Sequence, residues 1–239
     1  MLRVQCKRIA IIAVIARDRK SGCGETLYDG QMKAFRNLLR RTPFYGLYKA
    51  AGHYPDYWYW KLRGEPVRSP HLLKQRTVRE YAQRFGLRVL VETGTYYGEM
   101  VAAMKNRFTE VYSVEYEHAL AVRAQKKFAR SSHIHIVEGD SQKAIPEIIA
   151  SLRQPALFWL DAGYYGWAGL QGDKQRLTTE FEAILRDHRF RHVILMDDAR
   201  GLNGQNGAPT VHQLKQHIES AFPGRKVEVK HDILRITPE

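Results

Sequence analysis

The sequence predicts an α/β fold in which a mostly parallel, doubly wound sheet carries helices on both faces. From residue 70 onward, short apolar runs alternate five times with amphipathic segments, a pattern typical of parallel sheets. The apolar runs are continuous, as expected for strands that are buried on both faces. The segment 226–238 predicts two strands joined by a tight turn. We therefore expect seven strands, with an antiparallel hairpin strand at the C-terminal end.

The elements follow one another at regular spacing along the chain. The predicted strands before the hairpin cover 88–93, 110–116, 134–140, 156–162 and 192–199. The predicted helices cover 71–85, 99–108, 118–130, 143–152, 177–188 and 210–222. The first of these helices has apolar residues at helical spacing, and Gly86 follows it as a stop signal. No internal repeat or low-complexity tract interrupts the series.

The charge of the chain is concentrated in its N-terminal third. The net charge is +13, and residues 1–88 carry 19 Lys and Arg against 6 Asp and Glu, whereas residues 89–239 carry 19 of each. Such asymmetry suggests contact with something acidic, either a membrane surface or nucleic acid. We divide the chain into an N-terminal extension of uncertain status (1–31), a basic aromatic arm (32–70) and a main domain (71–239).

The arm combines a short basic amphipathic helix, expected at 32–52, with an aromatic and proline-rich stretch at 53–70 that we expect to be irregular. We interpret it as an acceptor-site lid, a contact in a homodimer or a weak anchor on an anionic membrane. The apolar run 9–16 is too short to span a bilayer. Cys6 and Cys23 are the two cysteines and define no disulfide framework, which favours a reducing, cytoplasmic setting, peripheral to the membrane if the arm binds lipid.

Acidic residues follow the predicted strands. In doubly wound folds, ligands bind at the carboxyl ends of the strands. Six of the ten residues that we place at these ends are carboxylates, more than solubility requires. The ten are Glu92, Gly94, Glu115, Tyr116, Gly139, Asp140, Ser141, Asp161, Asp197 and Asp198.

The turn after the first strand excludes two common nucleotide sites. The stretch ETGTYYG (92–98) lacks the G-x-G-x-x-G pattern of dinucleotide sites and the Gly-Lys-Ser/Thr of phosphate-binding loops. Glu92 would repel a diphosphate and favour a cation, and Gly94 would allow a ligand to approach the backbone closely. Glu115 lies 21 residues after Gly94, where an acid that binds ribose hydroxyls is expected. The turn therefore favours a positively charged nucleoside without phosphates.

Glu92, Gly94, Tyr96 and Gly98 form an E-x-G-x-Y-x-G stretch that resembles motif I of class I S-adenosylmethionine (SAM)-dependent methyltransferases. It most resembles the form found in catechol and caffeoyl-CoA O-methyltransferases, and the resemblance covers about residues 75–239. It implies a Rossmann-like fold, methyl transfer in the EC 2.1.1 class, and SAM as cofactor. The cofactor-binding residues implied are Glu92, Gly94, Tyr96, Gly98, Glu115, Tyr116, Asp140 and Ser141.

The same resemblance implies a divalent metal site, with Mg²⁺ held by Asp161, Asp197 and Asp198. Asp161 and Tyr164 are then the implied catalytic residues, because the family's lysine base stands where this chain has Tyr164. The DDA ending at 197–199 and the D-x-x-Y stretch at 161–164 also resemble metal-dependent sugar O-methyltransferases. The expected acceptor is therefore a hydroxylated small molecule, a sugar or a glycan.

Two other functions remain open from the sequence. The missing lysine base is compatible with a SAM-binding module that has lost catalysis. The basic arm is compatible with a nucleic-acid methyltransferase, although the stretch DAGYYGW (161–167) lacks the Asn/Asp-Pro-Pro-aromatic motif typical of N-methylating enzymes, which disfavours that interpretation. The general base is not determined by the sequence; the candidates are His188, His192, His212, Tyr164 and Tyr165.

Overall fold

The computed structural model describes residues 54–64, 68–161, 182–205 and 209–239. The chain divides into two compact units, Met1–Leu72 and Leu73–Glu239. In the first unit, the structure describes helix α4 (Tyr54–Leu62). The second unit contains the sheet, and it carries every site residue discussed below.

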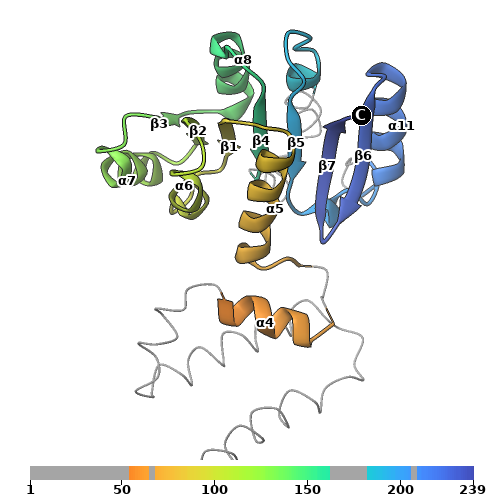
Figure 1. Ribbon diagram of the computed structural model, residues 1–239, viewed down its shortest axis with the longest axis horizontal. Coiled ribbons are helices and arrows are strands. Elements are labelled where there is room, and N and C mark those ends of the chain that lie inside the picture. Colours follow the sequence, from red (N-terminus) through yellow and green to blue (C-terminus); the bar gives the residue numbers. More distant parts are fainter. Residues whose placement is uncertain (1–53, 65–67, 162–181, 206–208) are drawn as a thin grey trace, which may run out of the picture. The chain divides into compact units, whose positions relative to one another are not determined.

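The second unit is built on a seven-stranded sheet with the order β3-β2-β1-β4-β5-β7-β6 (Figure 1). The strands β1 to β5 pair in parallel, whereas β7 is antiparallel to both β5 and β6. Strand β6 therefore runs in the direction of the parallel strands, and β7 alone opposes them. The predicted sheet and its C-terminal hairpin strand are confirmed.

The observed bounds agree closely with the predicted ranges. The strands are β1 (Val89–Thr93), β2 (Glu110–Glu115), β3 (Ile134–Glu138), β4 (Ala156–Leu160), β5 (Val193–Met196), β6 (Arg225–Lys230) and β7 (Ile233–Pro238). The helices that the structure describes in this unit are α5 (His71–Arg84, which begins two residues before it), α6 (Glu99–Met104), α7 (His118–Phe128), α8 (Ser141–Ser151), α11 (Val211–Ala221) and a 3₁₀ turn, η1 (Ala199–Gly201). Of the helix expected at 177–188, residues 182–185 are described and are helical.

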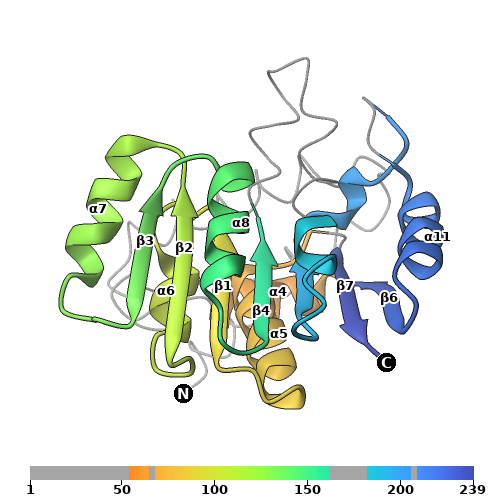
Figure 2. The same cartoon turned by 90° about the horizontal axis from the view of Figure 1, so that it is seen from above.

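Helices cover both faces of the sheet (Figures 1 and 2). One core joins α8, α11 and the helical residues Ile184 and Leu185 to the sheet. The other core joins α5, α6 and α7 to the opposite face. Successive residues of β4 alternate between them, since Phe158 belongs to the first core and Leu157 and Trp159 to the second. This two-sided burial explains why the strands read as continuous apolar runs.

The prediction of irregular structure at 53–70 is wrong for the first half of this stretch, because Tyr54–Leu62 is helical. Pro55 stands near the helix start, where its missing N–H costs nothing, and Asp56 lies in the first turn. Lys61 lies in the last turn, and Gly64 follows with a φ of 81°. These local signals outweigh the aromatic composition. The helix expected at 32–52 lies outside the described residues.

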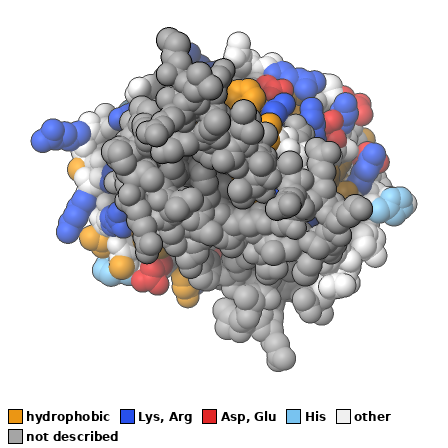
Figure 3. Space-filling model, turned by 90° about the horizontal axis from the view of Figure 1, so that it is seen from below, with side chains coloured by type: hydrophobic (Ala, Val, Ile, Leu, Met, Phe, Trp, Pro, Cys, Tyr) orange, Lys and Arg blue, Asp and Glu red, His pale blue; other side chains and the backbone are white. Residues whose placement is uncertain are grey.

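Within the described residues, no helix combines the length and hydrophobicity needed to span a bilayer. Where the described surface is visible in Figure 3, basic side chains lie beside acidic ones. This mixture agrees with the equal numbers of acidic and basic residues in 89–239.

Candidate active site

The carboxyl ends of five parallel strands meet at one edge of the sheet. The register pairs Thr93 of β1 with Val114 of β2 and with Leu160 of β4, and Leu160 in turn with Met196 of β5. Strands β2, β3 and β4 point the same way in Figure 2. The acids that end or follow these strands are thereby brought to one edge, which we call the ligand edge.

The turn between β1 and α6 adopts left-handed backbone conformations at Gly94 (φ 82°), Tyr96 (φ 49°) and Gly98 (φ 65°). Tyr96 differs from the two glycines, because a residue with a side chain is strained in the left-handed conformation. A side chain at Gly98 would lie 2.7 Å from the ring of Phe128. The amide nitrogens of Gly94 and Thr95 both donate to Val114 O, at 2.9 and 3.3 Å, and fasten the turn to the end of β2. The two glycines are thus required by conformation and, at Gly98, also by packing.

Glu115 is held at the tip of β2 by backbone amides. Its Oε2 accepts a hydrogen bond from the N–H of Tyr96 at 2.7 Å, and its Oε1 accepts one from the N–H of Glu117 at 2.9 Å. The residue is 7% exposed. Each bond occupies one lone pair, so the carboxylate keeps acceptor capacity for a further donor. The strained Tyr96 conformation therefore aims a backbone N–H at the acid expected to bind ribose.

Glu92 lies deeper in the same region and is 2% exposed. Its Oε2 accepts a hydrogen bond from the Ser113 hydroxyl at 2.6 Å, and the Thr95 hydroxyl lies 2.7 Å from Ser113 Oγ. Burial raises the pKa of Glu92 to about 8, and the charges of Asp161 and Glu115 act in the same direction. A buried carboxyl of this kind loses its proton readily when a positive charge lies against it.

Tyr116, Asp140 and Ser141 complete the predicted cofactor set around the ends of β2 and β3. Tyr116 is 76% exposed. Asp140 caps α8, since its Oδ1 accepts from the N–H of Gln142 at 3.0 Å, and Ser141 begins that helix. The cap explains Asp140 without a ligand, and its role in cofactor binding stays a prediction.

The acids that follow β4 and β5 lie close to Lys74, a residue that no sequence pattern indicated. Lys74 of α5 donates to Oδ2 of Asp197, and the Asp197 side chain is 1% exposed. Burial alone would lower the pKa of Lys74, but the charges of Asp197 and Asp161 raise it above its ordinary value. Asp161 as a whole residue is exposed, but protein atoms surround its carboxyl group. This burial, together with the nearby charge of Asp197, raises the pKa of Asp161 to about 7. Lys74 is thus a permanent cation among these acids.

Asp198 belongs to a second ion-pair network. Its φ is 54°, and its Oδ1 lies 2.9 Å from Nη1 of Arg200, which also pairs with Asp232 on the β6–β7 turn. The N–H of Arg200 donates to Oδ1 of the same Asp232 at 2.8 Å. This network ties η1 to the hairpin and directs Asp198 toward a cation of the chain itself.

These contacts decide whether the three predicted metal ligands fit a metal ion. Asp197 is paired with Lys74, and Asp198 with Arg200. In the part of the chain that the structure describes, no three His, Cys, Asp or Glu side chains are placed to hold a metal. Oδ1 of Asp197 is buried and has no hydrogen-bond partner among described residues, but the ammonium group of Lys74 stands beside it. As arranged, the acids do not fit Mg²⁺, and the predicted site stays a prediction.

Of the candidate general bases, two tyrosines lie outside the described residues, and His192 lies away from the site. Tyr164 and Tyr165 lie outside the described residues. His192 is fully buried; its Nδ1 accepts from the N–H of Ala156 at 3.0 Å, and its Nε2 lies 3.1 Å from Asp187. Because Ala156 begins β4, His192 lies at the edge opposite the ligand edge. It is a structural residue and not a general base for this site.

Lys127 is a further residue that the sequence analysis missed. Its ammonium group donates to the carbonyl oxygens of Tyr97 at 2.7 Å and Gly98 at 3.0 Å, and so supports the turn from α7. No local sequence pattern indicates the contacts of Lys127 and Lys74, because their partners lie 29 and 123 residues away in the sequence.

No protein-family model and no curated protein matches the chain. Among solved structures, it is similar to an O-methyltransferase from Bacillus cereus in complex with SAH (16% identity, TM-score 0.52, 73% of this chain and 84% of that chain covered). It is also similar to cofactor-bound Rv0187 from MTB (19% identity, TM-score 0.52, 72% and 82% covered). A third similar structure is the O-methyltransferase TomG from Streptomyces achromogenes in complex with SAM (12% identity, TM-score 0.50, 75% and 85% covered).

At these identities the likeness concerns the fold. The second unit has the fold of class I SAM-dependent O-methyltransferases, and the predicted resemblance is confirmed at that level.

Proposed function

We propose that this chain is a SAM-dependent methyltransferase that methylates a hydroxyl oxygen of a small molecule, a sugar or a glycan. The observation that carries the proposal is the Glu115 carboxylate, fixed by the amides of Tyr96 and Glu117 beside a left-handed, glycine-containing turn. A carboxylate so placed at the end of the second strand suits the two hydroxyls of a ribose.

The neighbouring residues suit the rest of the cofactor. Gly94 has no side chain, so a ligand can approach the turn closely. Glu92 would supply the negative charge for the cationic part of SAM, because its carboxyl group lies on β1 two residues before Gly94. Tyr116 and Ser141 would contact the base. Bound SAM would supply an electrophilic methyl group on a sulfonium, and the protein's task would be to position the acceptor oxygen in line with it.

The acceptor side would be formed by Asp161 and its charged neighbours. Asp161 is the exposed acid of the group, whereas Asp197 is buried against Lys74. We assign Asp161 the role of binding the acceptor hydroxyl and accepting its proton. Lys74 would hold Asp197 in place and limit the negative charge that gathers around the developing alkoxide.

Metal dependence is the part of the expectation that the contacts support least. Since Asp197 and Asp198 are paired with Lys74 and Arg200, we derive no step through a metal. The direct measurement is methyl transfer in chelator and after addition of Mg²⁺ or Mn²⁺. Unchanged activity in chelator is the expected result. A loss of activity that Mg²⁺ restores would reinstate the three-aspartate site.

The experiment that tests the proposal is calorimetric titration of SAM into the wild-type protein and into Glu115→Ala. We expect binding by the wild type and a loss of about 100-fold in the variant, because hydrogen bonds to a charged group contribute about 1.5–3 kcal/mol each. Glu138→Gln is the matched control, since Glu138 ends the neighbouring strand in register with Glu115 and is exposed. Equal affinity in all three proteins would contradict the proposed cofactor site.

A second step separates an enzyme from a binding module. The release of demethylated cofactor would be followed with panels of phenols, sugars and uronic acids, and with RNA. Turnover with a hydroxyl acceptor supports the proposal. Cofactor binding without turnover on any panel would favour the inactive SAM-binding module, and turnover on RNA alone would favour the nucleic-acid methyltransferase.

A further inference from the structure

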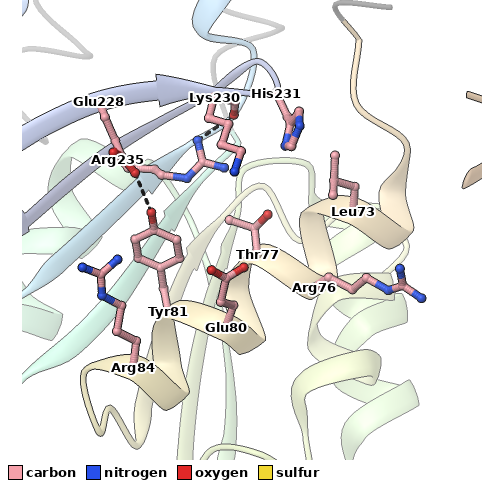
Figure 4. Close-up of a pocket in the computed structure, with 10 residues that line it drawn as sticks. All are labelled: Leu73, Arg76, Thr77, Glu80, Tyr81, Arg84, Glu228, Lys230, His231 and Arg235. Atoms are coloured by element: carbon pink, nitrogen blue, oxygen red, sulfur yellow. Dashed lines mark hydrogen bonds between the residues drawn. The ribbon is translucent and has the colours of Figure 1, made fainter. Parts of the chain in front are cut away.

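A pocket of about 310 Å³ opens between α5 and the β6–β7 hairpin (Figure 4). Its charged lining consists of four Lys or Arg side chains and two carboxylates, together with one histidine. The cationic side chains belong to Arg76, Arg84, Lys230 and Arg235. The pocket therefore has an excess of positive charge, although residues 89–239 as a whole are balanced.

The innermost cation is Arg235, which is 3% exposed. Its Nη1 donates to the carbonyl oxygens of Lys230 at 2.6 Å and Ile233 at 2.8 Å, and its guanidinium carbon lies 5.7 Å from the centre of the Tyr81 ring. Among the described residues it forms no ion pair, and its Nε and Nη2 donate no hydrogen bond. Burial lowers the pKa of Arg235, and the nearby groups, Glu228 and Glu80 among them, oppose this only in part. A further group of opposite charge in the pocket would therefore stabilise the guanidinium.

One of the two lining acids, Glu228, is engaged by the hydroxyl group of Tyr81. Oε1 of Glu228 accepts the hydroxyl hydrogen of Tyr81 at 2.8 Å, and both side chains are drawn in Figure 4 with this bond. Burial, followed by this hydrogen bond, raises the pKa of Tyr81 to about 12, so Tyr81 stays a donor at neutral pH. Glu228 is thus directed toward Tyr81, and Arg235 keeps two donor groups for a ligand.

Two elements, α5 and the β6–β7 turn, connect the pocket to the acids that follow β4 and β5. Leu73 lines the pocket, and the next residue, Lys74, binds Asp197. His231 lines the pocket, and the next residue, Asp232, binds Arg200, which pairs with Asp198. The first turns of α5 and the hairpin turn therefore belong to both sites.

We infer that this pocket is a subsite for an anionic group of the methyl acceptor, a phosphate, sulfate or carboxylate, bound by Arg235 with Lys230 at its rim. Binding of the anion stands on the pocket alone, whereas its assignment to the acceptor rests on the proposed function. A guanidinium with two adjacent donors matches the oxygens of such groups in a bidentate way. The acceptor class would then be acidic, for example a sugar phosphate or a uronic acid, with its hydroxyl at Asp161.

The first test measures anion binding without cofactor. Inorganic phosphate, sulfate and glucuronate would be titrated into the wild type, Arg235→Met, Arg235→Lys and Lys230→Gln. We expect Arg235→Met to weaken the best anion about tenfold, and Arg235→Lys and Lys230→Gln to weaken it less. Lys230 is exposed, so its variant reports on binding even if Arg235→Met does not fold. The matched control is Lys215→Gln, since Lys215 of α11 is exposed and lies outside the pocket.

The second test concerns the acceptor. Methyl transfer to a sugar phosphate or uronic acid would be compared with transfer to the uncharged sugar, in the wild type and in Lys230→Gln. A preference for the anionic acceptor that the variant reduces through KM supports the subsite. An equal response to both acceptors overturns its role in acceptor binding. Anion affinity that is equal in all variants overturns the pocket itself, whatever the result with SAM.

Discussion

The two halves of the ligand edge fix their acids by different means. On the side proposed to bind the cofactor, Glu115 is held by two backbone N–H groups. On the side proposed to bind the acceptor, Asp197 and Asp198 are held by the side chains of Lys74 and Arg200. Backbone amides orient a carboxylate and leave its charge in place, whereas a lysine or arginine also neutralises it. The first half is therefore prepared for a ligand with donor groups, whereas in the second half Asp197 and Asp198 are already paired within the protein.

The largest expected effect comes from Lys74→Met, which removes the cation and leaves a buried carboxylate. Breaking a buried pair by removing one partner costs about 3–5 kcal/mol, and we expect a loss of that order in the free energy of unfolding. Urea denaturation would measure it. Adding Asp197→Asn should recover part of the loss, because the amide carries no charge.

The matched control for Lys74 is Lys215→Met. Lys215 lies 3.6 Å from Glu219, with both side chains nearly half exposed. Such a pair contributes about 0–1 kcal/mol. If Lys74→Met costs no more than this control, the acceptor side is not balanced by Lys74, and the contrast between the halves is lost.

Glu92→Gln tests the charge of the cofactor side. The pKa of Glu92 is raised to about 8 from an ordinary 4.5, so the folded state holds a proton that the unfolded state releases. Its contribution to stability is therefore greatest below pH 4.5 and falls as the pH rises toward 8. Glutamine does not titrate, and we expect the variant to be more stable than the wild type by about 3 kcal/mol near pH 7. Urea unfolding between pH 5 and 8 would measure this difference.

The same residue links cofactor affinity to pH. If Glu92 faces the cationic part of SAM, binding expels its proton, and affinity rises from pH 6 to pH 8 in the wild type. Glu92→Gln should bind more weakly and with little pH dependence in this range. Calorimetry in buffers of different ionisation enthalpy counts the released proton. Parallel pH profiles in the two proteins would place the cation elsewhere.

Gly98→Ala tests the packing of the turn with a smaller expected effect. The added methyl would meet the Phe128 ring at 2.7 Å in a left-handed conformation. Gly86→Ala is the matched control, since its φ of 64° is nearly the same and nothing lies within 4 Å of the new atom. Both should pay about 1 kcal/mol for backbone strain, and Gly98→Ala about 1–2 kcal/mol more for overpacking. Thermal unfolding of both variants would show whether that excess exists.

The smallest effect is expected at the opposite edge, with His192→Gln. Burial lowers the pKa of His192, and the hydrogen bond to Asp187 opposes this only in part. The unfolded state then binds the proton more readily, so stability falls as the pH drops below about 6.5. The variant should show a weaker acid dependence in urea unfolding. Its SAM affinity should be unchanged, and a changed affinity would argue against a purely structural role.

Much of the fold could be predicted from local sequence patterns. The helix that was missed could also have been predicted from such patterns. The strands were predictable because their apolar runs are continuous, and Gly86 and Gly98 mark the conformations that helix ends and turns require. The helix at Tyr54–Leu62 was missed because aromatic composition was weighed above Pro55, Asp56 and Lys61. Asp140 shows another case, since it was assigned to the cofactor from its place after a strand, and the structure shows that it also caps α8.

The sequence by itself determined the order of the elements and the acids at the strand ends, because apolar periodicity and strand polarity bring those ends to one edge. Only the tertiary structure decided what each acid contacts. Lys74 reaches Asp197 across 123 positions, and the guanidinium of Arg235 lies over the ring of Tyr81, a residue of α5. Such contacts depend on how α5 and the hairpin pack on the sheet, and no local pattern encodes the charge that a distant helix brings to a buried carboxylate.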